Sequence, residues 1–422
     1  MKTSVKVSGD GFGILASLLF LVLTVSTPCR AQSRLSLQEA VNKALESRAS
    51  LKAEAERISI AQGLEKQAKL IANPALQLEN QNLRRGQTYT RDVDSYAYLT
   101  QPLDVLGKRK QRIAVAAEGV NRTQAGYEFT KRQIVQSVRL SYWQARGAQE
   151  KRDLLKATVE NFQKIIDYQS AQLSVGAISE QDLLRVRLEG EGLKIAANLA
   201  VIEATRARVQ LLKEMGQTDF SEALLTEPLD ANTFAIEPMD IRQVLTQRIE
   251  MKVASADVEE AQAKSRLQDV SARPDLNILY GYKRTQLVDS TSGVNTAMAG
   301  LQITLPITDR NQGNRAAASA EVRRQQQLLA ATEAEVRADY FGALQEYQLR
   351  RIEVVETLQP LREHARTISE ITQAAYAQGG MELLRLLDAE RARLDGELAY
   401  VQGMIEYQQS ISNLQAAEGA AP

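Results

Sequence analysis

Two kinds of hydrophobic pattern alternate along this chain. Apolar and polar residues alternate with a period of two at about 75–104 and again at about 275–306. In each region a polar stretch, 84–94 or 283–295, separates two such segments. A period of two is typical of β-strands with one apolar face, so each region is predicted to form a β-hairpin.

Long helices are predicted to fill most of the remaining chain. The stretch 108–174 contains no proline and is rich in Ala, Leu, Arg, Glu and Gln. As a single helix it would span roughly 100 Å, which is too long for one compact globule. It breaks at Val175-Gly176-Ala177, and a second helix is predicted to return over 180–214. An earlier helix, 49–72, should lie end to end with the returning one, so that two short helices pair with one long helix.

The chain is an internal duplication. Pro74 and Pro274 are 200 residues apart, and six other residues recur at the same offset. These are Leu45, Arg48, Lys52, Ala61, Gln62 and Leu76. Repetition at a fixed offset indicates two structurally equivalent halves. A capping box at Ser36-Leu37-Gln38-Glu39 opens the first half, and Asp240 is the predicted N-cap of the second.

The second half repeats the long helix at 312–376, a break at Gly379-Gly380, and a returning helix at 382–415. Pro360 lies inside this second long helix and should kink it, because proline cannot donate the backbone hydrogen bond. The short helix of this half, like its counterpart, should run to a proline, here Pro274.

The N-terminus is predicted to be a secretory signal. Lys2 and Lys6 precede an apolar run of about 12 residues, which is shorter than the roughly 20 that a membrane-spanning helix needs. Cys29-Arg30-Ala31 follows, and cleavage after Ala31 is favoured over lipidation of Cys29. The chain is therefore divided as follows: signal 1–31; first repeat 32–214, with a helical hairpin at 108–214; equatorial segment 215–238; second repeat 239–416, with a helical hairpin at 311–416; tail 417–422.

The composition gives little support for catalysis, metal binding or nucleic-acid binding. The signal carries the only cysteine, so the mature chain forms neither a disulfide nor a thiolate metal site. The signal holds three cations and one carboxylate, so its removal takes the formal charge from zero to −2, and no basic footprint for nucleic acid remains. His364 is the sole histidine and lies among charges in a predicted helix. Carboxylate pairs such as Glu259-Glu260 are interpreted as a solvated helix face, so we expect no catalytic residues, metal site or cofactor.

No run of 18 or more apolar residues follows the signal, so the mature chain has no predicted transmembrane helix. Contact with a membrane would need a β-barrel, and the four predicted strands of one chain are too few to close one. Open strand edges cannot face lipid, so several copies must share one sheet, and three copies give twelve strands. Five tyrosines cluster near these strands, where an interfacial aromatic girdle would lie, although tyrosine also favours strands in general. They are Tyr89, Tyr96, Tyr98, Tyr280 and Tyr282.

The order of elements, twice over, resembles the outer membrane factor family of TolC-like channel-tunnels. Three segments resemble its cation-efflux branch, of which CzcC is typical. They are Gln-Pro-Leu-Asp-Val-Leu-Gly-Lys-Arg at 101–109, its counterpart Leu-Pro-Ile-Thr-Asp-Arg-Asn-Gln-Gly at 305–313, and Ala-Tyr-x2-Gly-x4-Leu-x2-Leu-Asp-Ala-x-Arg at 375–391. The likeness covers essentially the whole mature chain.

This resemblance implies an α+β fold of long helical hairpins with two β-hairpins per chain. It further implies a homotrimer with a 12-strand barrel in outer-membrane lipid and a helical tunnel in the periplasm. A periplasmic adaptor and an inner-membrane pump are the implied partners, and the protein would be a passive exit duct. The segment 216–237 would be an equatorial insertion. The alternative function is a secreted coiled-coil structural or adaptor protein without a barrel, and the sequence does not identify the cargo.

The resemblance also assigns two candidate sites. Asp388 matches the acidic residue that lines the closed periplasmic aperture of similar channels, whereas Arg385 stands where TolC-like proteins carry a second acid. In a trimer, three pairs of Asp388 and Arg385 around one axis could hold the aperture shut. The alternative is an ordinary ion pair between the two residues on the helix surface. The turns at Val175, Gly176, Ala177, Gly379 and Gly380 are expected to dock the adaptor, although any helical hairpin also needs such a turn.

Overall fold

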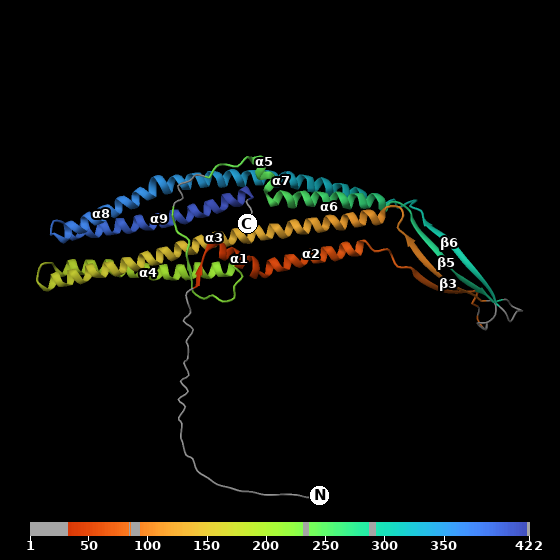
Figure 1. Cartoon of the computed structure of the whole chain (residues 1–422), viewed down its shortest axis with the longest axis horizontal. Helices are drawn as coiled ribbons and strands as arrows, with labels where there is room; N and C mark the ends of the chain where they lie inside the picture. The colour runs from red at the N-terminus through yellow and green to blue at the C-terminus, as the bar shows by residue number, and fades with distance from the viewer. Residues whose placement is uncertain (1–32, 84, 86–92, 231–235, 287–292, 420–422) are drawn as a thin grey trace, which may run out of the picture.

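The protein is a long layer of helices with a small β-sheet at one end (Figure 1). The computed structural model describes residues 33–83, 85, 93–230, 236–286 and 293–419. The predicted signal with Cys29, the hairpin residue Tyr89 and the last residues of the predicted tail lie outside the described residues.

The first repeat begins with the predicted capping box. The Glu39 carboxylate accepts a hydrogen bond from the Ser36 N–H at 2.9 Å, and Ser36 Oγ accepts one from the Glu39 N–H at 3.3 Å. The backbone of Arg48 is extended, so one helix ends there and the next begins. The elements are β1 (Ser33–Leu35), α1 (Leu37–Ser47), α2 (Ala49–Ala68), β2 (Ala75–Gln81), β3 (Asp94–Leu103), α3 (Lys108–Ser174), α4 (Glu180–Glu214) and β4 (Ala223–Leu225).

The second repeat has the same order of long elements. Asp240 is its N-cap, and its side chain accepts a hydrogen bond from the Arg242 N–H. The elements are α5 (Ile241–Gln247), α6 (Ile249–Ser271), β5 (Asp275–Thr285), β6 (Val294–Thr304), α7 (Gln312–Ile352), the π-helix η1 (Glu353–Leu358), α8 (Gln359–Ala377) and α9 (Leu383–Glu418). The helices predicted at 108–174 and 180–214 are observed with those bounds.

Three predicted helices differ from the observed ones. The returning helix predicted at 382–415 is observed as Leu383–Glu418. α2 ends at Ala68 instead of residue 72, and there Arg112 and Arg109 donate hydrogen bonds to the carbonyl groups of Ala68 and of the C-cap Lys69. The predicted helix 312–376 is not continuous, since η1 separates α7 from α8 immediately before Pro360. A wider π-helical turn accommodates the backbone bond that proline cannot make.

The helices pack side by side in one layer. α3 contacts α2 and α4 on one side and α6 and α9 on the other, and α7 and α8 lie beyond α6 and α9. Two short helices therefore pair end to end with each long helix, as predicted. The layer has two outer edges, one formed by α2 and α4 and the other by α7 and α8.

Both edges expose apolar side chains at helical spacing. They lie along α4 on one edge and along α7, η1 and α8 on the other, and most are about half exposed or more. They are Leu184, Leu188, Ile195, Leu199 and Ile202 on the α4 edge, and Phe341, Leu349, Ile352, Leu361, Ile368 and Ile371 on the other.

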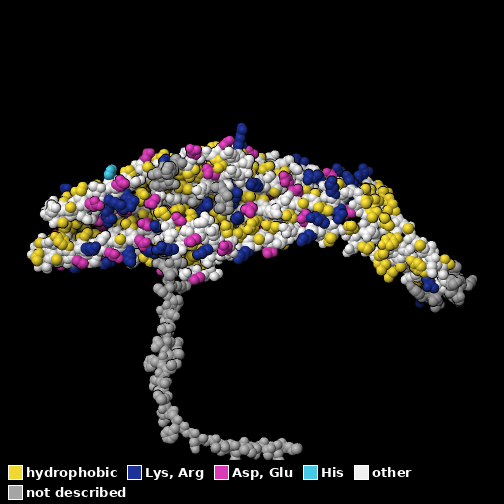
Figure 2. All heavy atoms as spheres, in the orientation of Figure 1, with side chains coloured by type: hydrophobic (Ala, Val, Ile, Leu, Met, Phe, Trp, Pro, Cys, Tyr) yellow, Lys and Arg dark blue, Asp and Glu magenta, His cyan; other side chains and the backbone are white. Residues whose placement is uncertain are grey.

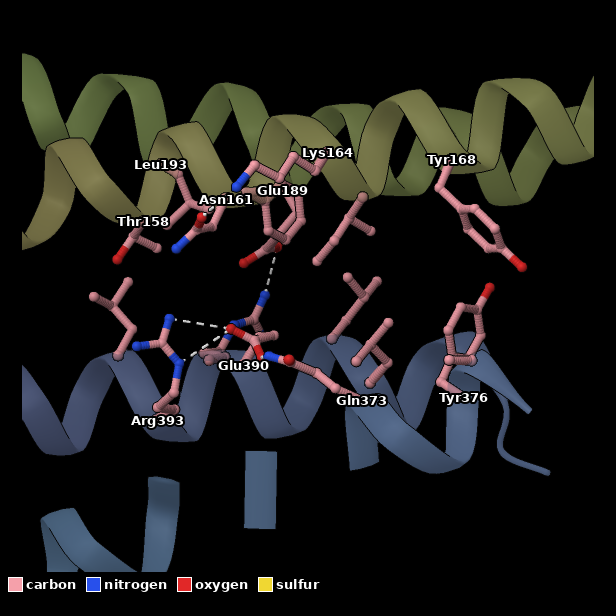
Figure 3. A pocket seen from close by; sticks show the side chains of 17 residues that line it. Thr158, Asn161, Lys164, Tyr168, Glu189, Leu193, Gln373, Tyr376, Glu390 and Arg393 are labelled. Atoms are coloured by element: carbon pink, nitrogen blue, oxygen red, sulfur yellow. Dashed lines mark hydrogen bonds and ion pairs between the residues drawn. The ribbon is translucent and has the colours of Figure 1, made fainter. Parts of the chain in front are cut away.

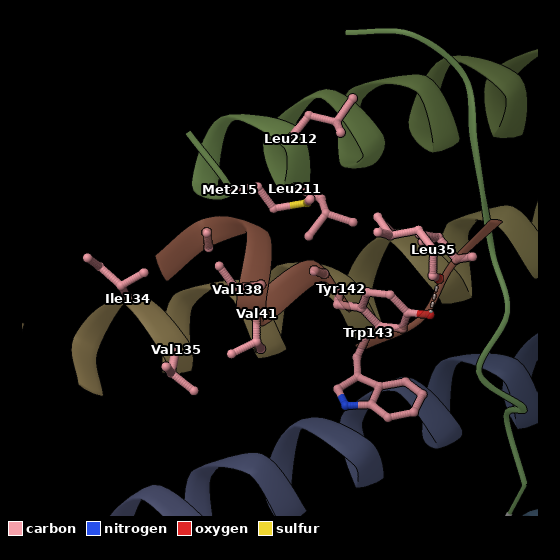
Figure 4. Packing of buried hydrophobic residues seen from close by; sticks show 14 of the residues in the cluster. Leu35, Val41, Ile134, Val135, Val138, Tyr142, Trp143, Leu211, Leu212 and Met215 are labelled. Carbon is pink, nitrogen blue, oxygen red and sulfur yellow. Dashed lines mark hydrogen bonds between the residues drawn. The ribbon is translucent and has the colours of Figure 1, made fainter. Parts of the chain in front are cut away.

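A core near the middle of the layer packs β1, α1 and the end of α4 against α3 (Figure 4). The hydroxyl of the buried Tyr142 donates to the Leu35 carbonyl at 2.9 Å and accepts from the Glu227 N–H at 3.3 Å. These bonds attach α3 to β1 and to the chain after β4. β1 and β4 pair as a parallel two-stranded sheet. The sequence pattern does not predict this sheet, because three-residue strands are too short to show a period.

The second repeat uses the same arrangement. The buried Tyr340 of α7 donates its hydroxyl hydrogen to the Met239 carbonyl at 2.7 Å. Met239 comes directly before the N-cap of α5, as Leu35 comes directly before the N-cap of α1. In each repeat, a tyrosine of the long helix therefore holds the chain at the start of the short helices.

The two hairpins combine into one antiparallel sheet in the order β2-β3-β5-β6. Directly opposite residues share a face, and one row across the sheet is Leu76, Leu99, Tyr280 and Ala299. The predicted alternation is confirmed, because one face is mainly apolar. Its apolar residues are Leu76, Leu78, Ala97, Leu99, Leu103, Leu276, Ile278, Tyr280, Tyr282, Ala297, Ala299, Leu301 and Ile303. Gln101 also lies on this face, and Asn80, Ser95, Arg284 and Asn295 lie on it towards the far end of the strands.

The opposite face is mainly polar and carries Gln77, Glu79, Thr100, Asn277, Lys283 and Gln302. Tyr96 and Tyr98 also lie on this face, whereas Tyr280 and Tyr282 lie on the apolar face, so the described tyrosines of the predicted girdle are divided between the two faces. In β3, Tyr96 and Tyr98 alternate with Ala97 and Leu99, so the odd and the even positions both carry apolar or aromatic side chains. The sequence therefore does not show which face each set lies on, and the strand register does. Lys283 Nζ lies 5.1 Å from the centre of the Tyr96 ring.

The outer strands of the sheet are β2 and β6, and each has one edge without a strand partner in the described chain. Across the described ranges, no helix combines the length and the apolar character needed to cross a membrane.

Candidate functional site

Two helical turns form the end of the layer farthest from the sheet (Figure 1). Gly176 has a φ of +73° and Gly379 a φ of +75°. In each turn the glycine N–H donates to the carbonyl three residues earlier, and the next N–H donates to the carbonyl five residues earlier, at 2.9–3.0 Å. This is the Schellman arrangement, in which the left-handed position favours glycine.

The five predicted tip residues are exposed at this end. Val175 is 78% exposed, and a Cβ added to Gly176 or Gly379 would meet no atom within 4 Å. Ala177 and Gly380 are also exposed. The two turns therefore present backbone and small side chains to solvent.

Just behind the tips, a cavity of about 570 Å³ separates the α3–α4 hairpin from the α8–α9 hairpin (Figure 3). Two polar contacts join the hairpins across it. The Gln169 amide of α3 donates to the Tyr376 hydroxyl of α8 at 2.6 Å, and Arg391 of α9 pairs with Glu189 of α4 at 2.7 Å. The Tyr168 ring meets the Tyr376 ring edge to face at 6.4 Å.

The two contacts differ in their environment. Gln169 is fully buried, and its Oε1 has no hydrogen-bond donor within the described chain. Arg391 is exposed, and its hydrogen bond to Glu189 raises the pKa of the guanidinium. A buried amide that loses its partner is expensive, whereas an exposed ion pair contributes little. The Gln169–Tyr376 bond is therefore the stronger constraint on the separation of the hairpins.

The half-buried carboxylate of Glu390 links α9 to α8 in the same region. Glu390 accepts a hydrogen bond from Ser369 at 2.6 Å and pairs with Arg393 at 3.1 Å. Burial raises the pKa of the Glu390 carboxyl, but the bonds from Ser369 and Gln373 and the charge of Arg393 bring it below its ordinary value. Glu390 is therefore ionised, and it fixes this hairpin as a unit.

Asp388 and Arg385 lie on the first turns of α9, and both side chains are exposed. Neither forms a hydrogen bond or an ion pair with the other in the described chain, so the ordinary surface ion pair between them is not formed. The charge of Asp388 also contributes to the raised pKa of Arg391, after the larger effect of the hydrogen bond to Glu189. The Asp388 carboxylate is consequently available to a neighbouring molecule or to solvent.

Sequence reasoning missed Gln169, Glu189 and Glu390. Comparison of the two repeats could have identified Gln169, because an equivalent position in the second repeat is also polar. Gln169 stands seven residues before Gly176, and Thr372 stands seven residues before Gly379. Both are buried polar residues, and a polar residue at the same place in both hairpins marks a position that faces another element.

The described residues contain no group of three or more His, Cys, Asp or Glu side chains placed to hold a metal ion. His364 is exposed on α8 (Figure 2).

Comparisons with known proteins agree on the family and the fold. A family model described as outer membrane efflux protein matches residues 40–217 and 241–420, one match in each repeat. The cobalt-zinc-cadmium resistance protein CzcC of Cupriavidus metallidurans is 25% identical over 376 residues, which cover 89% of this chain and 87% of CzcC. The solved outer-membrane channel OprN superposes with a TM-score of 0.75 at 19% identity, over 91% of this chain and 90% of OprN. CusC gives a TM-score of 0.74 at 18% identity, over 91% and 92% of the two chains.

The hydrogen bond between Gln169 and Tyr376 can be tested with the variant Tyr376→Phe. This change leaves the buried amide without a partner, so we expect local opening around both residues to become easier by about 1–3 kcal/mol. Amide hydrogen exchange of segments 165–176 and 372–380 measures it. The control is Tyr168→Phe, whose hydroxyl accepts only from the exposed Gln172. Equal exchange in the two variants would show that this bond does not hold the hairpins together.

Proposed function

The chain belongs to the outer membrane efflux protein family, and on this premise we propose that three copies form the exit duct of a tripartite efflux system. It is an outer-membrane channel component and not an enzyme. In the proposal, a periplasmic adaptor and an inner-membrane pump deliver the substrate, and the duct lets it pass without chemistry. Nothing in the comparisons favours the alternative of a secreted coiled-coil or adaptor protein.

The two-faced sheet is the observation that carries the proposal. Its apolar face suits lipid, and its polar face suits a water-filled lumen. β2 and β6 each have an edge with no partner in the described chain, and unpaired backbone groups are not tolerated in lipid. Pairing of β6 with β2 of the next copy removes both edges. Three copies of a four-stranded sheet give a closed barrel of twelve strands.

The helical layer supports the same assembly. Its α4 edge and its α7–α8 edge both expose apolar side chains, including Leu188 at 75% and Ile371 at 62%. Contact between the α4 edge of one copy and the α8 edge of the next buries both stripes. Such head-to-tail contacts form a closed ring when the rotation between copies allows it. The ring of helices would continue the barrel as a tunnel.

The substrate is proposed from similarity. CzcC is named as a cobalt-zinc-cadmium resistance protein, and we propose that this duct likewise exports heavy-metal cations. Because the described residues hold no candidate metal cluster, selection among cations would belong to the pump, and the duct would provide only the path.

The barrel proposal is tested by two arginine substitutions at neighbouring positions of β6. Leu301 lies on the apolar face and Gln302 on the polar face. Leu301→Arg puts a charge toward lipid, at a cost of roughly 2–4 kcal/mol near the middle of the bilayer, so we expect much less heat-resistant trimer in purified outer membranes. Gln302→Arg should leave the trimer near its normal level. Equal trimer levels in the two variants would contradict a lipid-facing apolar surface.

Asp388 is proposed to line the periplasmic aperture. Three copies would place three exposed carboxylates, with three Arg385 side chains, around one axis. Asp388→Ala is then expected to change the conductance and lower the cation selectivity of the purified trimer in a planar bilayer. Glu160→Ala, which removes an exposed carboxylate from α3, serves as the control. If Asp388→Ala behaves like the control, Asp388 does not lie at the aperture.

The tips are proposed to dock the adaptor, since six such turns would crown the end of the trimer farthest from the barrel. Ala177→Trp adds bulk without disturbing the left-handed Gly176, so it should leave trimer levels intact and abolish resistance to cobalt, zinc and cadmium in a deletion strain. Gly176→Asn tolerates the left-handed conformation and adds little bulk, and it should keep resistance. Full resistance with Ala177→Trp and with the equivalent Gly380→Trp, at normal trimer levels, would rule out docking at the tips.

A further inference from the structure

The four junctions between helices and strands lie at one level of the molecule. Arg109 of α3 donates to the Lys69 carbonyl at the end of α2. Arg273, after α6, donates to the Leu106 carbonyl before α3 at 2.7 Å. Asn311, before α7, donates to the Gln268 carbonyl of α6 at 2.8 Å. These bonds connect α2, α3, α6 and α7 side by side at their sheet-proximal ends.

Positive charge is concentrated at this level. The segments 66–74, 104–112, 269–275 and 305–315 contain nine Lys and Arg residues but only four Asp, in a chain whose total charges balance. Figure 2 shows Lys and Arg gathered where the helices meet the sheet. The excess comes from the first repeat, because the segments 269–275 and 305–315 of the second repeat hold three cations and three Asp.

Carboxylates neutralise only part of this charge. Lys69, Lys108, Arg112 and Arg315 pair with Glu65, Asp275, Asp104 and Asp269 at 2.7–3.0 Å. Five other cations have no carboxylate partner within the described chain. We call them the basic collar: Lys66, Arg109, Lys110, Arg273 and Arg310. Four of the five side chains are exposed, and Arg109 is half-buried.

The three arginines of the collar are held in place by backbone carbonyl groups. Arg109 bonds to Lys69, Arg273 to Leu106, and Arg310 Nε to Ile307 at 3.2 Å. A guanidinium has five N–H groups, so each arginine keeps donors for another acceptor. Phosphate oxygens are strong acceptors for a guanidinium.

The collar adjoins the apolar face of the sheet. Leu305 and Ile307 lie between the end of β6 and Arg310 and are 64% and 69% exposed. Just after α2, Leu70 and Ile71 are 56% and 63% exposed beside the carbonyl groups that Arg109 and Arg112 contact. An apolar band that ends in exposed cations matches the boundary between acyl chains and charged headgroups.

We infer that the basic collar binds the phosphates of anionic phospholipids in the periplasmic leaflet of the outer membrane. The inference rests on the proposed function, because it requires the apolar face of the sheet to meet lipid. Lys108 is excluded, since it pairs with Asp275 on the polar face of the sheet. In a trimer the collar would repeat three times around the duct and fix the depth at which the barrel sits.

The test uses the full-length trimer reconstituted in vesicles of phosphatidylethanolamine with a minor fraction of phosphatidylglycerol. Native mass spectrometry counts the lipids that stay bound after extraction. The wild type should retain phosphatidylglycerol above its share of the vesicle. The triple variant Arg109→Gln, Lys110→Gln, Arg310→Gln should lower that enrichment at least about threefold.

Two further variants separate charge from structure. Lys156→Gln, Arg242→Gln, Lys252→Gln removes the same charge from exposed sites away from the junction, and it should keep the enrichment. Arg109→Lys with Arg310→Lys keeps the charge and should also keep it. If inserted wild-type trimers show no enrichment, or if both triple variants lose it equally, the basic collar does not bind anionic phospholipids. Either result would leave the proposed function standing. Failure of the wild type to insert as a trimer would instead overturn the proposed function.

Discussion

The structure depends on the pairing of backbone groups at the edges of one sheet. A four-stranded sheet with an apolar face cannot enter lipid alone, because the outer edges of β2 and β6 would keep unpaired N–H and C=O groups. The sheet is also unfavourable in water, because its apolar face would stay exposed to solvent. Leu78, for example, is 74% exposed. Both costs disappear when neighbouring copies pair edge to edge. The sheet therefore favours the proposed assembly, and the helices would follow the same rotation from copy to copy.

The helical layer transmits this arrangement over a long distance without a single compact core. Each repeat has its own cluster, in which Tyr142 or Tyr340 bonds to the carbonyl before the short helix. Two smaller buried clusters join the α3–α4 hairpin to α9 nearer the tips, through Leu394 in one and Leu387 in the other. The hydrogen bond between Gln169 and Tyr376 adds a polar contact between the same hairpins.

Much of the fold follows from the sequence because its elements are long and periodic. α3 and α4 could be bounded to the residue, since glycine turns and capping residues mark their ends. The register of the sheet could not be predicted, so the face of Tyr96 and Tyr98 was open until the pairing was known. β1 and β4 could not be predicted, because they depend on contact with Tyr142 and not on a local sequence pattern. At the site, local rules located the glycines, whereas the Gln169–Tyr376 and Glu189–Arg391 contacts join residues more than 200 positions apart.

Disulfide cross-linking between β2 and β6 tests the shared sheet most directly. The only cysteine lies at position 29, so a variant with Leu78→Cys in β2 and cysteine at Ala297, Ala299 or Leu301 in β6 gives a clean background once the signal is removed. Within one chain β3 and β5 separate these strands, so a bond between them must join two copies. Oxidation of outer membranes should give, for at least one β6 position, covalent dimers and trimers and no larger product. Only monomers at all three positions, or a ladder that continues beyond three copies, would contradict a closed barrel of three chains.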